Sequence, residues 1–222
     1  MSKYKTVLFD LDGTLIDSSP GITTSAAYAM KKVLGRIEAP STLKCFIGPP
    51  LREQFMNFCG ADLETGTKLV SAYREYYSAG GLFECSLYDG VPELLDNLRN
   101  DGCSILLATI KPEVFAKRIL EHFSIDSKFD YIAGSNLDNT RTVKYEVICY
   151  ALENAPEHCC VEPGKCVMVG DSPHDITHAN KAGIDGIAAL YGFSEKKLLD
   201  EVPAVAMCSN TEEIYEYIKS VK

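Results

Sequence analysis

The sequence lacks the features that mark membrane and secreted proteins. None of its apolar runs approaches the length of about 20 residues that crosses a bilayer. The apolar stretch near the N-terminus, Val7 to Phe9, ends at an aspartate and does not continue as a signal peptide would. Internal repeats and low-complexity segments are absent as well. We therefore expect no membrane partner and no secretion.

Cysteine is plentiful, but its spacing does not suit zinc binding or disulfides. No C-x-x-C pair occurs among the nine cysteines, Cys159 and Cys160 are adjacent, and the count is odd. Such usage is typical of a reducing cytoplasm, where cysteine acts mainly as a small apolar residue. We expect a cytoplasmic protein.

Positive charge is scarce. The 222 residues include 22 Lys and Arg against 31 Asp and Glu, which gives a net charge of −9. An acidic surface repels a polyphosphate backbone, so we expect no nucleic-acid partner. A phosphate-binding site would have to collect its positive charge locally, from a few lysines, helix N-termini or a metal ion. The composition does not indicate the oligomeric state.

Short apolar runs that end at polar residues indicate strands buried on both faces, as in a parallel sheet. The runs are Thr6 to Phe9, Ser104 to Ala108, Tyr131 to Ala133, Cys166 to Val169 and Ile184 to Leu190. Helical patterns lie between them. One has Pro112 in its first turn, and another places Val143, Val147, Ile148 and Ala151 on one face. This alternation predicts an α/β core with a doubly wound, Rossmann-like parallel sheet.

Residues 16–87 break the alternation. Three helical patterns follow one another there without a convincing strand, and each ends at a glycine: Ile22 to Leu34, Leu51 to Phe58 and Leu63 to Tyr77. We therefore expect an all-helical cap domain of residues 16–87, inserted into a core domain of residues 1–15 and 88–222 that carries the catalytic site.

Asp10 and Asp12 are the strongest chemical signal. They stand in D-L-D-G-T directly after the first buried run, and the strand period of two sends both to one side. Ligands of open α/β sheets bind beyond the carboxyl ends of the strands. A plain turn is one alternative, since Asp and Gly often end strands. A calcium loop does not fit, because its glycine and glutamate positions hold Leu15 and Gly21.

Asp171 and Asp175 lie in G-D-S-P-H-D after a later buried run. Asp171 should share a crevice with Asp10, where converging carboxylates need a cation between them. Oxygen ligands without a cluster of cysteine or histidine select Mg²⁺. Asp175 fits a structural role in the first turn of a helix about equally well, because it suits the helix dipole.

Thr109 and Lys144 are candidate phosphate ligands. The Thr109 hydroxyl can donate a hydrogen bond to a phosphate oxygen. Lys144 is in the first turn of a predicted helix, where the dipole disfavours a cation unless the ammonium reaches an anion. Lys111, Arg52 and His174 are weaker candidates, and we interpret them as surface residues.

Together these residues resemble the motifs of the haloacid dehalogenase-like superfamily of phosphatases, over nearly the whole chain. The resemblance is to the phosphoglycolate phosphatase-like branch with a small helical cap. The four motifs correspond to Asp10 to Thr14, to Thr109, to Lys144, and to Gly170-Asp171 with Asp175. Ser172-Pro173 departs from the pattern, because this stretch is often basic in close relatives.

The resemblance implies a phosphatase that acts on a small phosphorylated metabolite in two steps. Asp10 would attack phosphorus, and Asp12 would protonate the leaving oxygen and later deprotonate water. Mg²⁺ would be held by Asp10, Asp171 and the backbone carbonyl of Asp12, with Asp175 in support. Thr109 and Lys144 would hold the remaining phosphate oxygens.

Two alternatives stay open. A sugar phosphomutase can share all four motifs but returns the phosphoryl group to its substrate, so it does not accumulate free phosphate. A protein that only binds phosphorylated ligands would not need the Asp10/Asp12 pair. Dehalogenases of the superfamily lack the second aspartate, so Asp12 favours phosphate chemistry.

Overall fold

The computed structural model describes residues 2–138 and 140–222. The chain forms two compact units, which we call the core unit (Met1–Ile16 with Leu87–Lys222) and the helical unit (Asp17–Ser86). Two short strands, β2 (Ile16–Asp17) and β3 (Ser86–Leu87), pair with each other where the chain passes from one unit to the other. The sequence did not predict these two strands.

The core unit is built on a six-stranded sheet in the order β5-β4-β1-β6-β7-β8, in which every neighbouring pair is parallel. The strands are β1 (Thr6–Phe9), β4 (Ser104–Pro112), β5 (Tyr131–Ser135), β6 (Cys166–Gly170), β7 (Asp185–Ala189) and β8 (Ala206–Cys208). The strand order reverses at β1, which lies between β4 and β6, and in such sheets ligands bind at this point. The predicted doubly wound parallel core is confirmed.

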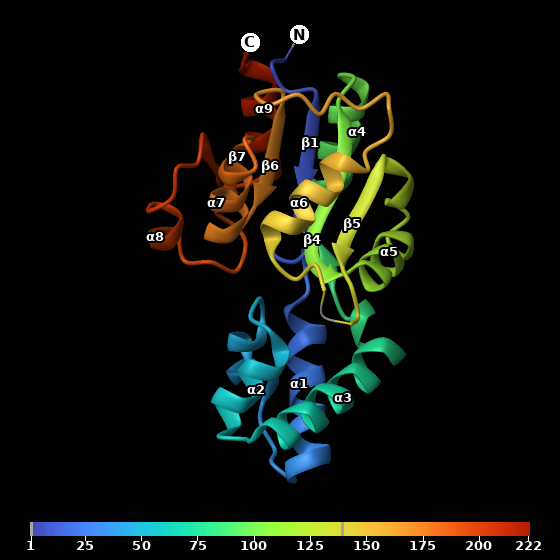
Figure 1. Ribbon diagram of the computed structural model, residues 1–222, viewed down its shortest axis with the longest axis vertical. Helices are drawn as coiled ribbons and strands as arrows, with labels where there is room; N and C mark the ends of the chain where they lie inside the picture. Colours follow the sequence, from blue (N-terminus) through green and yellow to red (C-terminus); the bar gives the residue numbers. More distant parts are fainter. Residues whose placement is uncertain (1, 139) are drawn as a thin grey trace. The chain divides into compact units, whose positions relative to one another are not determined.

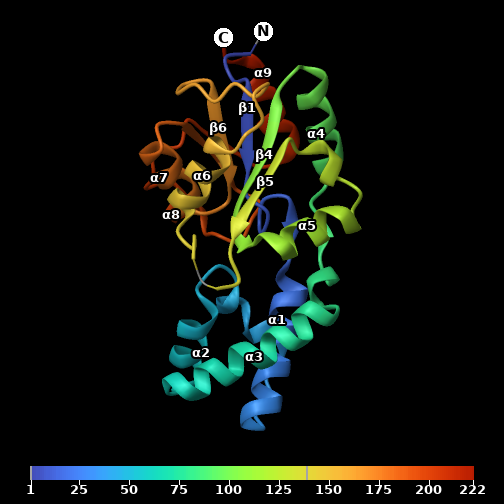
Figure 2. The same cartoon turned by 45° about the vertical axis from the view of Figure 1, so that its right-hand side comes forward.

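Helices cover both faces of this sheet (Figures 1 and 2). On one face, α6 (Lys144–Glu153) packs against α7 (Pro173–Lys181); on the other, α4 (Val91–Asn100) packs against α9 (Thr211–Ser220). Also present are α5 (Glu113–His122), which contacts β4 and β5, and the short α8 (Lys196–Leu199). Every residue of β1 and β6 is buried, as expected for strands covered on both faces.

Strand β4 differs from its prediction, because it continues beyond Ala108 to Pro112. Its pairing with β5 shifts register between Ala108 and Pro112, and Pro112 then pairs with Ser135. Thr109 therefore lies within the strand instead of following it. Pro112 is the N-cap residue that precedes α5, so the prediction that it lies in the first turn of a helix is wrong.

The helical unit contains α1 (Ser19–Leu34), α2 (Leu51–Cys59) and α3 (Leu63–Ala79), and α3 packs against both other helices. Gly35 and Gly60 end α1 and α2 in the left-handed conformation that glycine adopts without strain. Phe46 and Phe55 contact each other in its core, with ring centroids 4.7 Å apart. In the described part of the chain, we find no helix with the length and apolarity that a membrane span needs.

Candidate active site

Three carboxylates meet where β1 and β6 end. Asp10 follows β1, Asp171 follows β6, and Asp175 lies in the first turn of α7. Because β1 and β6 run side by side with Phe9 opposite Val169, the residues that follow them reach the same edge of the sheet. Oxygen atoms of the three carboxylates lie within 4.8 Å of one another, and all three residues are buried. We call them the acidic cluster.

Asp175 reaches this cluster because Gly170 has no side chain. A Cβ at Gly170 would lie 2.3 Å from the Cβ of Asp175. Asp175 also begins α7 with a capping box, in which the Ser172 hydroxyl accepts from the Asp175 N–H and Asp175 Oδ2 accepts from the Ser172 N–H. The Ser172-Pro173 departure from the family pattern thus forms a regular helix start, and Asp175 has a structural role as well as a place in the cluster.

Asp171 is enclosed by the loop that follows β1. Gly13 in this loop has φ +83°, and a Cβ there would lie 2.3 Å from Asp171 Oδ2. The same oxygen accepts a hydrogen bond from the Phe193 N–H at 2.7 Å. A glycine at position 13 of the D-x-D-G-T motif is therefore needed both for the turn and for the approach of the loop to Asp171.

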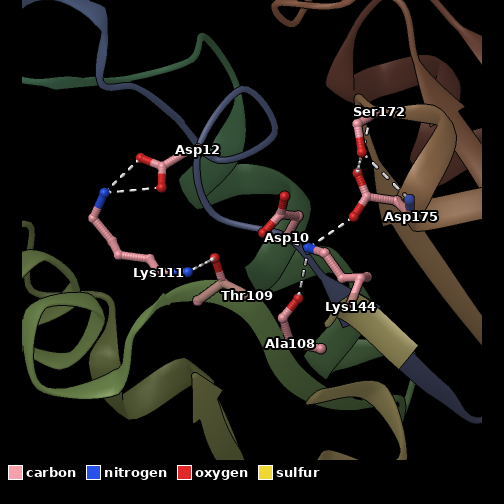
Figure 3. Close-up of polar contacts among 8 residues, drawn as sticks. All are labelled: Asp10, Asp12, Ala108, Thr109, Lys111, Lys144, Ser172 and Asp175. Carbon is pink, nitrogen blue, oxygen red and sulfur yellow. Dashed lines mark hydrogen bonds and ion pairs between the residues drawn. The ribbon is translucent and has the colours of Figure 1, made fainter. Parts of the chain in front are cut away.

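Lys144 is the first residue of α6, and its side chain is only 3% exposed. Its ammonium lies 2.8 Å from Asp10 Oδ1 and 2.7 Å from Asp175 Oδ1, and it donates to the Ala108 carbonyl at 3.1 Å (Figure 3). Burial alone would lower the pKa of Lys144, but Asp10 and Asp175 outweigh burial and raise it. Lys144 therefore stays positively charged in this buried position.

The acidic cluster carries more negative charge than Lys144 can offset. Burial raises the pKa of Asp10 to about 6, with a contribution from Asp175 and against the opposing effect of Lys144. Burial, followed by the charges of Asp175 and Asp10, raises the pKa of Asp171 to about 8. With all three carboxylates ionised, the acidic cluster would carry more negative charge than the one ammonium offsets, and this repulsion contributes to the raised pKa values of Asp10 and Asp171. These oxygen donors therefore fit a hard divalent cation.

Asp12 does not belong to the acidic cluster through its side chain. Its carboxylate points toward Lys111, whose Nζ lies 2.7 Å from Oδ1 and 2.8 Å from Oδ2 (Figure 3). The Lys111 side chain is 6% exposed, so its interpretation as a surface residue is wrong. Thr109 is buried as well, and its hydroxyl oxygen accepts from the Lys111 N–H at 3.2 Å.

A signal for Lys111 was present in the sequence. If the strand period of two is continued past Ala108, Thr109 and Lys111 lie on one side and Ile110 on the other. In the structure Thr109 and Lys111 are buried and Ile110 is exposed. The other two weak candidates, Arg52 and His174, are exposed as expected.

Comparison with known proteins places the chain in a family. The family model described as haloacid dehalogenase-like hydrolase matches residues 7–189. A protein of Pseudomonas aeruginosa named 5'-nucleotidase is 39% identical over 223 residues, which cover 98% of this chain and 97% of that protein. The tyrosine-protein kinase PtkA of Mycobacterium tuberculosis is 36% identical over 195 residues, which cover 88% of this chain and 65% of PtkA.

A solved structure supports the same family assignment. The crystal structure of a predicted phosphatase from Clostridium acetobutylicum matches with a TM-score of 0.88 and 39% identity, over 98% of this chain and 99% of that one. This chain belongs to the haloacid dehalogenase-like hydrolase family. The predictions of the family, and of an enzyme that is a phosphatase of this family, are confirmed.

Proposed function

We propose that this chain is a Mg²⁺-dependent phosphatase that hydrolyses a small phosphomonoester through an aspartyl-phosphate on Asp10. The observation that carries the proposal is the buried Asp10 carboxylate, which Lys144 contacts at 2.8 Å beside the other carboxylates of the acidic cluster. A phosphate dianion can approach a carboxylate only where positive charge reduces their repulsion.

The residues that would hold Mg²⁺ are Asp10 and Asp171, together with the backbone carbonyl of Asp12 that the family resemblance implies. Asp175 would support them through Lys144, which it contacts at 2.7 Å. When bound, the ion supplies positive charge that offsets the carboxylates and the phosphoryl oxygens.

In the first step, the Asp10 carboxylate forms a bond to phosphorus, and the bond from phosphorus to the leaving oxygen breaks. Asp12 gives a proton to that oxygen, so a neutral alcohol departs. The Thr109 hydroxyl donates to a phosphoryl oxygen, while Lys144 offsets negative charge beside Asp10. In the second step, water attacks phosphorus and loses a proton to Asp12. The bond to Asp10 then breaks and inorganic phosphate is released.

We assign catalysis to the core domain of residues 1–15 and 88–222, and the choice of substrate to the helical cap of residues 16–87. All of the residues given roles above lie in the core unit. The resemblance to the phosphoglycolate phosphatase-like branch makes a phosphoglycolate-like ester the first substrate to test.

The test is phosphate release from phosphoglycolate, nucleoside 5'-monophosphates, sugar phosphates and pyrophosphate, with Mg²⁺ or with excess chelator. We expect release that depends on the metal. Asp10→Asn should reduce it by at least about 10³-fold, because the nucleophile is lost. Circular dichroism and melting temperature check that the variant is folded.

Other outcomes would replace the proposal. A sugar phosphate that isomerises without releasing phosphate would indicate a mutase, and tight binding of phosphoesters without turnover would indicate a binding protein. Phosphotyrosine formed on the chain after incubation with ATP alone would indicate the activity that the name of PtkA states. Undiminished hydrolysis by Asp10→Asn would exclude Asp10 as the nucleophile.

A further inference from the structure

Lys111 forms an ion pair that the reaction steps described above do not use. Its Nζ contacts both oxygens of the Asp12 carboxylate, at 2.7 and 2.8 Å, in a side chain that is 6% exposed (Figure 3). A buried ammonium is costly unless it is paired, and breaking such a pair leaves an uncompensated charge. The ion pair therefore ties the position of the Asp12 carboxylate to that of the Lys111 ammonium.

The backbone holds both partners in place. Phe9 pairs with Leu107 in the sheet, so the two segments that continue to Asp12 and Lys111 start side by side. On the Lys111 side, the N–H donates to Thr109 Oγ1 at 3.2 Å, and the next residue, Pro112, pairs with Ser135 of β5. The main chain of Lys111 is thus held on both sides, and from this position its side chain reaches the Asp12 carboxylate.

The alternative position for the Asp12 carboxylate is the acidic cluster, since Asp12 is only two residues from Asp10. Any cation that offsets the acidic cluster also attracts Asp12, because opposite charges attract each other. A carboxylate drawn into the cluster would no longer be available to exchange a proton with a leaving oxygen. The Lys111 ammonium provides a competing positive charge on the opposite side of Asp12.

We propose that Lys111 is a positioning residue for Asp12: it holds the Asp12 carboxylate out of the acidic cluster and oriented for proton exchange with the leaving oxygen. This inference rests on the proposed phosphatase function. Lys111 acts through Asp12 and not on the phosphate. Removing its charge should therefore slow hydrolysis most for substrates whose leaving oxygen must receive a proton.

The test compares two leaving groups in wild type and in Lys111→Met, a variant of similar shape without the charge. The substrates are p-nitrophenyl phosphate, whose phenolate leaves without a proton, and the alkyl phosphate that the wild type hydrolyses best. The measured quantity is kcat/KM, because it covers the steps up to departure of the leaving group. We expect a loss of about 10²-fold for the alkyl ester, as for a misplaced catalytic group. For the aryl ester we expect a change within about threefold, since it needs no general acid.

Two further variants separate positioning from other roles. Lys111→Met combined with Asp12→Asn should be no slower on the alkyl ester than Asp12→Asn alone, because Lys111 acts through Asp12. Lys117→Met removes an exposed lysine of α5 that pairs with Glu113, and it should leave both rates unchanged. Should Lys111→Met fail to fold, Lys111→Arg takes its place. It keeps the charge with a different geometry, so its alkyl-to-aryl ratio should still fall below that of the wild type.

Several results would overturn the inference. Equal losses on both esters would mean that Lys111 binds the phosphate itself, and additive losses in the double variant would mean that it acts independently of Asp12. A faster reaction of the alkyl ester in Lys111→Met would mean that the ion pair with Lys111 hinders proton transfer by Asp12 instead of assisting it. If the wild type releases no phosphate from either ester, the proposed function fails and this inference fails with it. In the other three cases the inference fails alone.

Discussion

Replacing Asp171 by asparagine is expected to stabilise the metal-free protein at neutral pH. Burial and the charges of Asp175 and Asp10 raise the pKa of Asp171 from its ordinary value of 3.8 to about 8. A carboxyl group with a higher pKa in the folded than in the unfolded protein binds more protons when folded. The folded state therefore loses stability as the pH rises from the lower value to the higher one.

The size of the effect follows from these two values. About three pH units of the interval lie below pH 7, and each is worth about 1.4 kcal/mol, so Asp171 lowers the free energy of unfolding by about 4 kcal/mol at pH 7. Asparagine has the same shape and no charge, and its oxygen can still accept from the Phe193 N–H. Weakening that one hydrogen bond costs about 1 kcal/mol, which leaves a net gain of about 3 kcal/mol.

The assay is urea denaturation in excess chelator between pH 4 and pH 8, repeated with Mg²⁺. The gain of Asp171→Asn should be present at pH 7 and disappear toward pH 4, and Mg²⁺ should stabilise the wild type more than the variant. Asp185→Asn is the matched control. Although burial alone would raise the pKa of Asp185, hydrogen bonds from Lys3 and Tyr4 lower it, so this variant should lose stability at pH 7.

Two results would refute the reasoning. If Asp171→Asn is no more stable than the wild type at pH 7 in chelator, the pKa of Asp171 is not raised in the folded, metal-free protein. If Mg²⁺ stabilises both proteins equally, Asp171 is not among the groups that hold the ion.

Two further substitutions test the surroundings of the acidic cluster. Gly13→Ala adds a Cβ 2.3 Å from Asp171 Oδ2 at φ +83°, whereas Gly102→Ala has a similar φ of +79° and meets nothing within 4 Å. Gly102→Ala should cost about 1–2 kcal/mol in urea denaturation from backbone strain alone, and Gly13→Ala clearly more; equal losses would contradict the close approach to Asp171. Thr109→Val keeps the shape and removes the hydroxyl, so kcat/KM for phosphate release should fall about tenfold or more while Thr109→Ser stays near wild type. Full activity of the valine variant would remove Thr109 from the phosphate site.

The strands that could be predicted are those with a complete local pattern. The apolar run Thr6 to Phe9 coincides with β1 because both of its faces are covered. Strand β8 has no such pattern, because it is a three-residue strand at the edge of the sheet with two of its residues only half-buried. The prediction that Val143 lies on the apolar face of a helix is wrong: Val143 precedes α6, which begins at Lys144, and it is 45% exposed.

The sequence indicates which residues belong to the candidate site, but not which side chains pair with one another there. Acidic residues after buried strands are visible in the sequence, and parallel pairing of β1 with β6 brings Asp10 and Asp171 together. The ion pair of Lys111 with Asp12 joins residues 99 positions apart. No local pattern indicates that pairing; the strand period of two indicates only that Lys111 lies on the same side as Thr109.

The central position of β1 has a consequence for how the protein folds. Thr6 pairs with Ser104 on one side and with Cys166 on the other, so both pairings of the first strand close long loops of chain. Contacts between such distant residues slow folding, because the loop entropy is lost before the contacts form. The helical unit lies within both loops, and its two ends meet where β2 pairs with β3. Once this unit has folded, it brings residues 16 and 87 together, which shortens the chain that must be ordered before β1 and β4 can join.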